Sequence, residues 1–476
     1  MLSSRLRSRE IDGGGQPFKR RCVRQRFSAF SKQEPVLDTH DPEVANLKLA
    51  FLRRRSKVVE IVAAGDVVFA LTLSGVCAAF RGTKRIAFLN SSPDEVIRSL
   101  FYNKSNDSLV TVSVYRADNF SSLRCRNTPV EYIKRGKPAE GFALFESECL
   151  KWPGFVEFDD VNGKVLTYSA ESKCYRVWEM TNYEPLFSVP DDDVTEIKIS
   201  PGIMLLIHTR QGSSVPLKIL SIEDGAVLKA FNHLLIRTKK VDFIEQFNEK
   251  LLVKQDGENL NIIDVHTGAV VSVDRTEFVT PSAFIFLYEN NLFLTFRARQ
   301  VTVWNFRGEQ VTHFEDHELW HPETNTSNIF ITAAQDYIVS FCRPQPQGAK
   351  RSGGVSGGSS ADEDDETSSA AGSQAASAAA TPATAPPPSL RLEHQQRPLP
   401  TSEMSFRGVP PTPAAGAIHV SHILTGRCVA KLADCSKGSD CAHANALRDV
   451  SSLHFSEERN ELYVGDRYGQ LHIYTQ

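Results

Sequence analysis

The sequence lacks any continuous apolar run of the roughly 20 residues that a membrane-spanning helix needs. Its first residues lack the apolar core of a secretory signal. The acidic residues Glu10 and Asp12 are atypical of an organelle transit peptide. The nine cysteines, an odd number, show no paired spacing. A disulfide framework is therefore not expected, and a reducing compartment, the nucleus or the cytosol, fits best.

The common nucleotide-binding motifs are also missing. The sequence contains no GxxxxGK[ST] loop and no GxGxxG after a strand-like run. These absences exclude the enzyme classes that depend on those motifs. We therefore expect no catalytic residue, no metal and no cofactor, and predict that the protein is not an enzyme.

Charge is nearly balanced overall but unevenly placed. The formal net charge is −3, which gives no reason to expect membrane or general nucleic-acid binding. Residues 1–57, however, hold 14 basic and 6 acidic residues, so the rest of the chain carries about −11. Nucleic-acid contact is expected only through this basic arm.

Composition divides the chain into zones. Residues 1–55 are basic and predict a largely disordered arm, with a short helix over residues 41–55 and a strand that closes a ring. Residues 56–343 and 417–476 are dense in short strand-like runs. Residues 344–416 are rich in Gly, Ser, Ala and Pro and predict a disordered insert, because they cannot bury enough apolar surface to offset the entropy of ordering.

The strand-rich zones repeat a short alternating strand that ends in a polar residue and a turn. Clear copies occupy residues 175–180, 217–225, 260–268 and 301–308, and weaker ones occupy 142–146, 418–423 and 471–474. Equivalent positions lie 42, 43 and 41 residues apart from Trp178 through Leu220 and Ile263 to Trp304. This period is what a four-stranded propeller blade needs. The helical patterns of an α/β protein are absent.

Counting the repeats gives eight units, which begin near residues 58, 97, 155, 194, 241, 282, 328 and 450. The last unit ends on its third strand, so residues 26–30 or 35–38 are expected to supply the fourth and remove an exposed edge. The interval of 33 residues from Phe145 to Trp178 is short for a blade. The prediction is an all-β, single β-propeller of seven or eight four-stranded blades, with the insert in the penultimate blade.

The Tyr-x-Val-Trp ending at Trp178 and the Val-x-Val-Trp ending at Trp304, together with this period, resemble the WD40 repeats of transducin β-like proteins. The resemblance covers about 350 residues, but no unit has the full Trp-Asp pair. It implies a rigid platform for binding other proteins. A fold of this kind serves many functions, so function has to be argued from its surface.

Three patterns suggest chemistry and are better explained as loops. Residues 317–321 spell HExxH, but a proline follows directly and no helical pattern surrounds them. Cys435, Cys441 and His443 lack the tight paired spacing of zinc ligands. The aspartates at 159–160 and 191–193 fall at turns, where solvated loops explain them better than a pair of catalytic carboxylates.

The arm offers a candidate nuclear-localisation signal, and RNA phosphates or a solvated segment are its alternatives. Its basic residues are Lys19, Arg20, Arg21, Arg24 and Arg26. The sequence Trp304-Asn305-Phe306-Arg307 partly resembles the Trp-Asp-x-Arg box of propellers that serve as substrate receptors of cullin-4 ubiquitin ligases. That resemblance implies adaptor contact by Trp304 and Arg307, whereas the alternative is that Trp304 packs in a blade core.

The sequence thus predicts a non-enzymatic scaffold or adaptor, monomeric within a larger assembly of other proteins. A cullin-4-type substrate receptor is the alternative, and an enzyme or an RNA-associated factor is less favoured.

Overall fold

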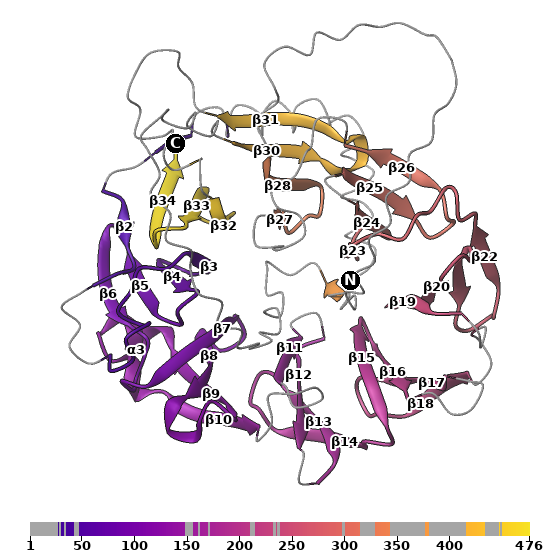
Figure 1. Cartoon of the computed structure of the whole chain (residues 1–476), viewed down its shortest axis with the longest axis horizontal. Coiled ribbons are helices and arrows are strands. Elements are labelled where there is room, and N and C mark those ends of the chain that lie inside the picture. The colour runs from indigo at the N-terminus through magenta and orange to yellow at the C-terminus, as the bar shows by residue number, and fades with distance from the viewer. Residues whose placement is uncertain are drawn as a thin grey trace, which may run out of the picture.

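The computed structural model describes most of the strand-rich sequence. The described residues are 27, 30–32, 35–41, 47–147, 156–159, 162–169, 172–209, 215–231, 235, 239–297, 300–314, 329–342, 377–379, 416–433, 447 and 450–476. Within them the chain forms eight sheets, one for each blade, arranged as a ring (Figure 1). Each is built on antiparallel strands; six sheets have four strands, and two have five. The predicted all-β propeller is confirmed, and the number of blades is eight. No helix in the described part is long and apolar enough to cross a membrane.

Each of the first seven blades runs in chain order from an innermost to an outermost strand. Blade one contains β3 (Val58–Ala64), β4 (Val67–Thr72), β5 (Cys77–Arg81) and β6 (Lys84–Phe88). Blade two contains β7 (Glu95–Asn103), β8 (Ser108–Tyr115), β9 (Leu123–Pro129) and β10 (Phe142–Ser147). Blade three contains β11 (Val156–Asp159), β12 (Lys164–Ser169), β13 (Cys174–Glu179) and β14 (Pro185–Pro190). Blade four contains β15 (Val194–Ser200), β16 (Ile203–His208), β17 (Leu217–Ser221) and β18 (Val227–Phe231).

The second half of the ring follows the same plan. Blade five contains β19 (Val241–Phe247), β20 (Lys250–Gln255), β21 (Leu260–Asp264) and β22 (Val270–Val273). Blade six contains β23 (Ala283–Leu287), β24 (Leu292–Arg297), β25 (Gln300–Asn305) and β26 (Gln310–His313). Blade seven contains β27 (Ile329–Ile331), β28 (Tyr337–Cys342), β30 (Ala417–His422) and β31 (Arg427–Ala433). Blade eight is built on β32 (Val450–Ser456), β33 (Glu461–Asp466) and β34 (Gln470–Thr475).

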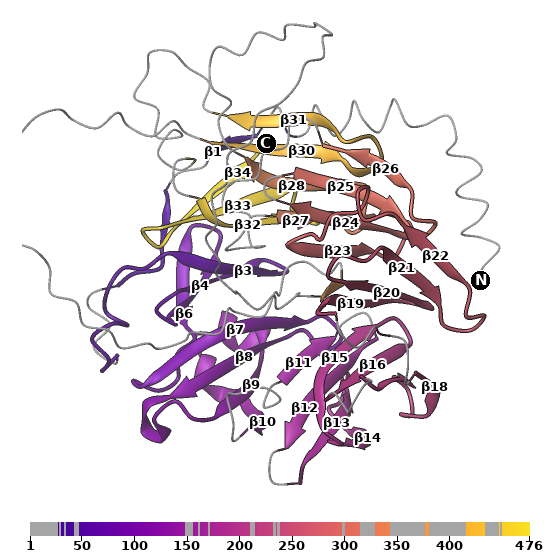
Figure 2. The same ribbon diagram turned by 45° about the vertical axis from the view of Figure 1, so that its right-hand side comes forward.

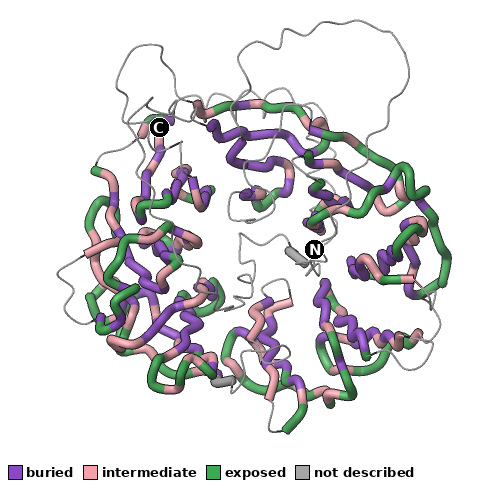
Figure 3. Tube along the Cα trace, viewed as in Figure 1, coloured by how far each residue is buried: buried purple, intermediate pink, exposed green. Residues whose placement is uncertain are grey.

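The core lies between blades, because neighbouring sheets pack face to face. All six residues of β4, in the second position of its blade, are buried, whereas four of the five residues of the outer strand β18 are exposed. Figure 3 shows the same gradient around the ring, from buried strands near the axis to exposed strands at the rim. Hairpins between first and second strands need a left-handed residue, and Asn248 (φ 47°) and Asn291 (φ 51°) adopt it.

The N-terminal segment closes the ring, as the sequence predicted. Both β1 (Ser31–Lys32) and β2 (Leu37–Asp38) pair antiparallel with β34, with Leu37 opposite Leu471. Leu37, in the segment 35–38, is buried between blades eight and one. Further back, the rings of Phe27 and Phe30 pack on Phe455 at centroid distances of 5.1 and 6.4 Å.

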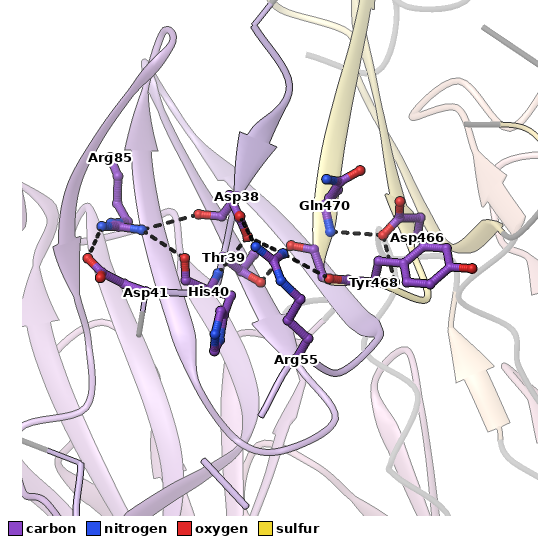
Figure 4. A network of polar contacts seen from close by, with 10 residues as sticks. Asp38, Thr39, His40, Asp41, Arg55, Arg85, Asp466, Tyr468 and Gln470 are labelled. Carbon is purple, nitrogen blue, oxygen red and sulfur yellow. Dashed lines mark hydrogen bonds and ion pairs between the residues drawn. The ribbon is translucent and has the colours of Figure 1, made fainter. Parts of the chain in front are cut away.

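Polar contacts hold this junction together (Figure 4). The Arg55 guanidinium donates two hydrogen bonds to the Asp38 carboxylate at 2.9 and 2.6 Å. Arg85 pairs with Asp41, and the Thr39 hydroxyl donates to the carbonyl of Gly469 at 2.7 Å. The junction therefore joins blade one, blade eight and the N-terminal segment.

Two details differ from the sequence-based expectations. Of the short helix expected over residues 41–55, residues 42–46 lie outside the described part, and residues 47–55 form turns. Leu47, Leu49 and Leu52 are buried there, and their spacing differs from that of one face of a helix. The run 142–146, taken as an equivalent of the third-strand repeats, is instead the fourth strand, β10. The interval from Phe145 to Trp178 is short because a fourth strand lies closer to the next blade than a third strand does. A short helix, α3 (Val130–Lys134), separates β10 from the true third strand, β9.

The insert interrupts blade seven between β28 and β30, the position predicted for it. Most of residues 344–416, whose disorder was predicted, lies outside the described part. The exception within it, besides residue 416, is β29 (Ser377–Ala379), which pairs in parallel with β23. Figure 2 shows the stacked blades obliquely, with β30 and β31 of blade seven beyond β28.

Candidate protein-binding groove

A groove of about 1100 Å³ crosses blades four, five and six. Its walls are turns between first and second strands, at residues 201–203, 247–250 and 291, and turns after third strands, at 265–266 and 305–307. All of these turns lie on one face of the ring, because the four strands of a blade alternate in direction. The groove is therefore assembled from three repeats at equivalent positions.

Stacked aromatic rings form the base of the groove. The rings of Phe247 and Phe306 stack with their centroids 4.4 Å apart, and Tyr288 stacks on Phe247 at 4.8 Å. Phe247 is only 1% exposed, so this base is anchored in the core between blades five and six. A rigid apolar base loses little conformational entropy when a ligand side chain packs on it.

Exposed apolar side chains extend the groove along the outer strands. Leu228 on β18 is 50% exposed and Val271 on β22 is 40% exposed. Leu228 is the extra residue of a β-bulge, since Ile219 pairs with Lys229 and Leu220 with Val227. Val311 on β26 occupies the same bulged position in blade six. Bulges also twist an outer strand so that it is a poor template for pairing with another chain.

The charges of the groove are only partly paired. Lys250 lies 2.5 Å from the Asp264 carboxylate and lowers the pKa of that carboxyl, while His266 lies 3.4 Å from Glu249. Lys229 and Arg307 have no ion-pair partner within the described residues. Two available cations therefore lie in the wall of the groove, on blades four and six.

The two residues of the candidate adaptor box are separated by the structure. Trp304 is buried, its indole N–H donates to the hydroxyl of Thr295 at 2.9 Å, and its ring contacts Phe278. Arg307, at the following turn, is exposed and lines the groove. The tryptophan thus belongs to the blade core, and the arginine belongs to the surface.

This division predicts that the two residues contribute differently to stability. Trp304→Phe removes the donor to Thr295 and leaves a small void, so the free energy of unfolding should fall by about 2 kcal/mol. Arg307→Ala should change it by no more than about 0.5 kcal/mol. Chemical denaturation of both variants measures these values, and equal values would contradict the division.

The other residues singled out from the sequence are not gathered into a site. The nuclear-localisation candidates Lys19, Arg20, Arg21, Arg24 and Arg26, the HExxH string and the Cys435 cluster lie outside the described residues. Asp159 accepts a hydrogen bond from the Asn162 side chain, and Asp191 accepts one from Tyr168 at 2.9 Å, so both hold turns. The described residues contain no group of three or more potential ligands placed to bind a metal.

Sequence reasoning missed a set of buried charges on the inner strands. The ammonium group of Lys198 lies 2.8 Å from carboxylate oxygens of both Glu196 and Glu245. Burial raises the pKa of Glu157 to about 7 and that of Glu60 to about 8. The partners Lys198 and Glu245 are 47 residues apart in the sequence, so no local pattern reveals the contact.

Architecture alone places this protein among the eight-bladed β-propellers. The chain belongs to the family described as Domain of unknown function (DUF7899), whose model matches residues 15–359. The matched region begins before the ring-closing strands and ends inside the insert of blade seven.

The chain also resembles two solved structures at low sequence identity. No curated protein matches the chain. A computationally designed protein, Ika8, is 13% identical, with a TM-score of 0.47, over 90% of this chain and 98% of its own. BamB from Moraxella catarrhalis is 11% identical, with a TM-score of 0.40, over 93% of this chain and 98% of its own.

Proposed function

We propose that this propeller is a non-enzymatic scaffold that binds an extended segment of a partner protein in the groove across blades four to six. The observation that carries the proposal is the groove itself, which has a volume of about 1100 Å³ and exposes the apolar side chains of Leu228 and Val271. Lys229 and Arg307 in its wall are unpaired among the described residues. Exposed apolar surface beside polar groups is typical of protein-interaction sites.

The chemistry of the groove suggests the kind of segment that it takes. Apolar side chains would pack on Phe306, Leu228 and Val271, and acidic side chains would face Lys229 and Arg307. Recognition through side chains rather than strand addition follows from the bulges of β18 and β26, which disturb the pairing edge. The partner segment is therefore expected to be extended, with an apolar centre and acidic ends.

The protein would serve as a monomer within a larger assembly in the nucleus or cytosol. Kinship with the WD40 family is part of this proposal. Its support is a shared hydrogen bond: Trp178 donates to Thr167 at 2.8 Å as Trp304 does to Thr295. In both blades a tryptophan of the third strand is thereby fixed to the second strand.

Negative charges placed on the apolar surface of the groove should strongly reduce the recovery of partner proteins. The double variant Leu228→Glu/Val271→Glu would bury two carboxylates against an apolar ligand, so we expect stoichiometric partners to fall at least about tenfold, a cost of about 1.4 kcal/mol. The measurement is affinity purification with quantitative mass spectrometry from the native cell. Phe142→Glu, at a residue 52% exposed on blade two, is the matched control. If the groove and control variants retain the same partners, the groove is not the site.

Arg307 favours one specific alternative. Its exposure at the turn after β25 leaves it free for a ligase adaptor, as the resemblance to cullin-4 substrate receptors implies. In that case Arg307→Ala alone should remove the adaptor and Leu228→Glu should not. Unchanged recovery of a cullin-4 adaptor with Arg307→Ala would count against this alternative.

A further inference from the structure

A second surface lies on the opposite face of the ring, at the junction of blades eight and one. It consists of the segment 47–57, which precedes β3, and the β33–β34 turn at Arg467 and Tyr468. The Arg55 guanidinium donates to the carbonyl of Tyr468 at 3.4 Å, which joins the two parts. We call this the basic surface. The β33–β34 turn connects a second to a third strand, and the segment 47–57 leads into a first strand. Both therefore lie on the face away from the groove.

The basic surface concentrates cations. The segment 47–57 contains Lys48, Arg53, Arg54, Arg55 and Lys57 and no acidic residue. All five are exposed, as is Arg467. Three leucines beneath the segment are buried, and Arg53 donates to the carbonyl of Leu47 at 2.6 Å. The cations are therefore displayed from an anchored backbone rather than from a free tail.

Only part of this charge is used within the fold. Arg55 is committed to Asp38, with which it forms two hydrogen bonds. Arg54 and Lys57 have no side-chain partner among the described residues. These two side chains thus remain available to an external anion.

Exposed rings accompany the cations. Phe51 is 44% exposed and Tyr468 is 50% exposed. The Arg467 guanidinium lies 4.7 Å from the centroid of the Tyr468 ring, an arrangement that presents a flat, charged stacking surface. Planar groups of a ligand, such as nucleic-acid bases, can stack on exposed rings of this kind.

The geometry points to a binding site for single-stranded nucleic acid on the basic surface. Phosphates would meet Arg54 and Lys57, and bases would stack on Phe51 and Tyr468, which is the combination that single-strand binding requires. Four of the six cations are arginines, whose planar group pairs with phosphates and stacks on rings. A phosphopeptide or a membrane surface would use the charges but would leave the rings without planar partners.

The test is binding of an oligouridylate to the full chain, measured by fluorescence anisotropy over a range of salt concentrations. A length of about 16 nucleotides is near the upper site size of single-strand-binding domains. In Arg54→Gln/Lys57→Gln, affinity at low salt should fall about tenfold or more, and the slope of log affinity against log salt should shrink by about 1.4, since each phosphate contact contributes about 0.7. The matched control, Lys84→Gln/Lys104→Gln, removes two charges from exposed lysines of blades one and two and should bind as the wild type does.

Stacking requires a separate variant. Phe51→Ala should weaken binding about tenfold with an unchanged salt slope, because a stacked base is lost but no phosphate contact is. Phe142→Ala is its control, at a ring of similar exposure on blade two. No binding by the wild type, equal losses in control and test variants, or binding of phosphatidylserine vesicles or a phosphopeptide in place of the oligonucleotide would each overturn the assignment. Failure here leaves the groove proposal intact, since the two surfaces lie on opposite faces.

Discussion

Deletion of residues 1–41 is expected to destabilise the whole ring and cause the protein to associate. Blade eight would lose both strands that pair with β34, and the buried Phe27, Phe30 and Leu37 would disappear from its core. At about 1.5 kcal/mol or more for each buried side chain, the free energy of unfolding should fall by at least about 4 kcal/mol. The exposed edge of β34 would also be free to pair with another chain.

Chemical denaturation followed by circular dichroism measures the first effect, and size-exclusion chromatography measures the second. The point variant Leu37→Ala isolates the contribution of the strand and should cost about 2–5 kcal/mol, the range for a fully buried leucine. Leu73→Ala is its control, because the same change occurs at a residue that is 56% exposed. An unchanged unfolding midpoint after the deletion would show that the other blades hold the ring closed.

Periodicity revealed the ring because each blade repeats one local arrangement of strands. The first strands of the eight blades begin at 58, 95, 156, 194, 241, 283, 329 and 450, within two residues of the expected starts. Blade two was harder to interpret, since α3 separates β9 from β10 and the outer strand resembles the third strand of other blades. An alternating strand reports burial on one side, and it does not report the position of that strand in a sheet.

The groove was out of reach of sequence reasoning for a physical reason. Its wall combines turns of three blades, and the exposure of Leu228 depends on a bulge that the register of β17 and β18 creates. The sequence pointed to Trp304 and Arg307 together, and only the structure separates them, because the indole of Trp304 is buried and donates a hydrogen bond to Thr295. The signal available in the sequence was an apolar residue soon after the turn in several units, at Leu186, Leu228, Val271 and Val311.

The same limit applies to the basic surface. The run Arg53-Arg54-Arg55 is visible in the sequence, but it does not say which arginine serves the fold. The structure assigns Arg55 to Asp38 and leaves Arg54 exposed, and it brings Tyr468 from the far end of the chain to the same place. Ring closure thus creates this surface, because it joins the first and last blades.

Replacement of Lys198 by methionine is expected to have the other large effect on stability. Glu245 is fully buried, and its Oε1 accepts a hydrogen bond from Lys198 at 2.8 Å. Its second oxygen, Oε2, has no hydrogen-bond partner among the described residues. Without the ammonium group, the carboxylate must remain charged and unpaired or take up a proton. Breaking a buried pair in this way costs about 3–5 kcal/mol.

The pH dependence identifies the cause. Burial raises the pKa of Glu245, and Lys198 opposes that rise, so Lys198→Met should raise the pKa further. The folded variant then holds a proton that the unfolded chain, with its glutamate near 4.5, has already released. Stability of Lys198→Met should therefore decrease as the pH rises above about 4.5, more steeply than that of the wild type.

Two controls separate charge from packing in this experiment. Lys198→Met/Glu245→Leu removes both charges and should recover most of the lost stability and the shallower pH dependence, because an apolar pair replaces a buried ion pair at little cost. Lys137→Met breaks the pair with Glu140 on the surface, where the side chains are 58% and 51% exposed, and should change stability by less than about 1 kcal/mol. If the double variant is as unstable as Lys198→Met, lost packing around the lysine stem is responsible. If both are as stable as the wild type, Glu245 is neutral at pH 7 in the native ring and the pair contributes nothing to folding.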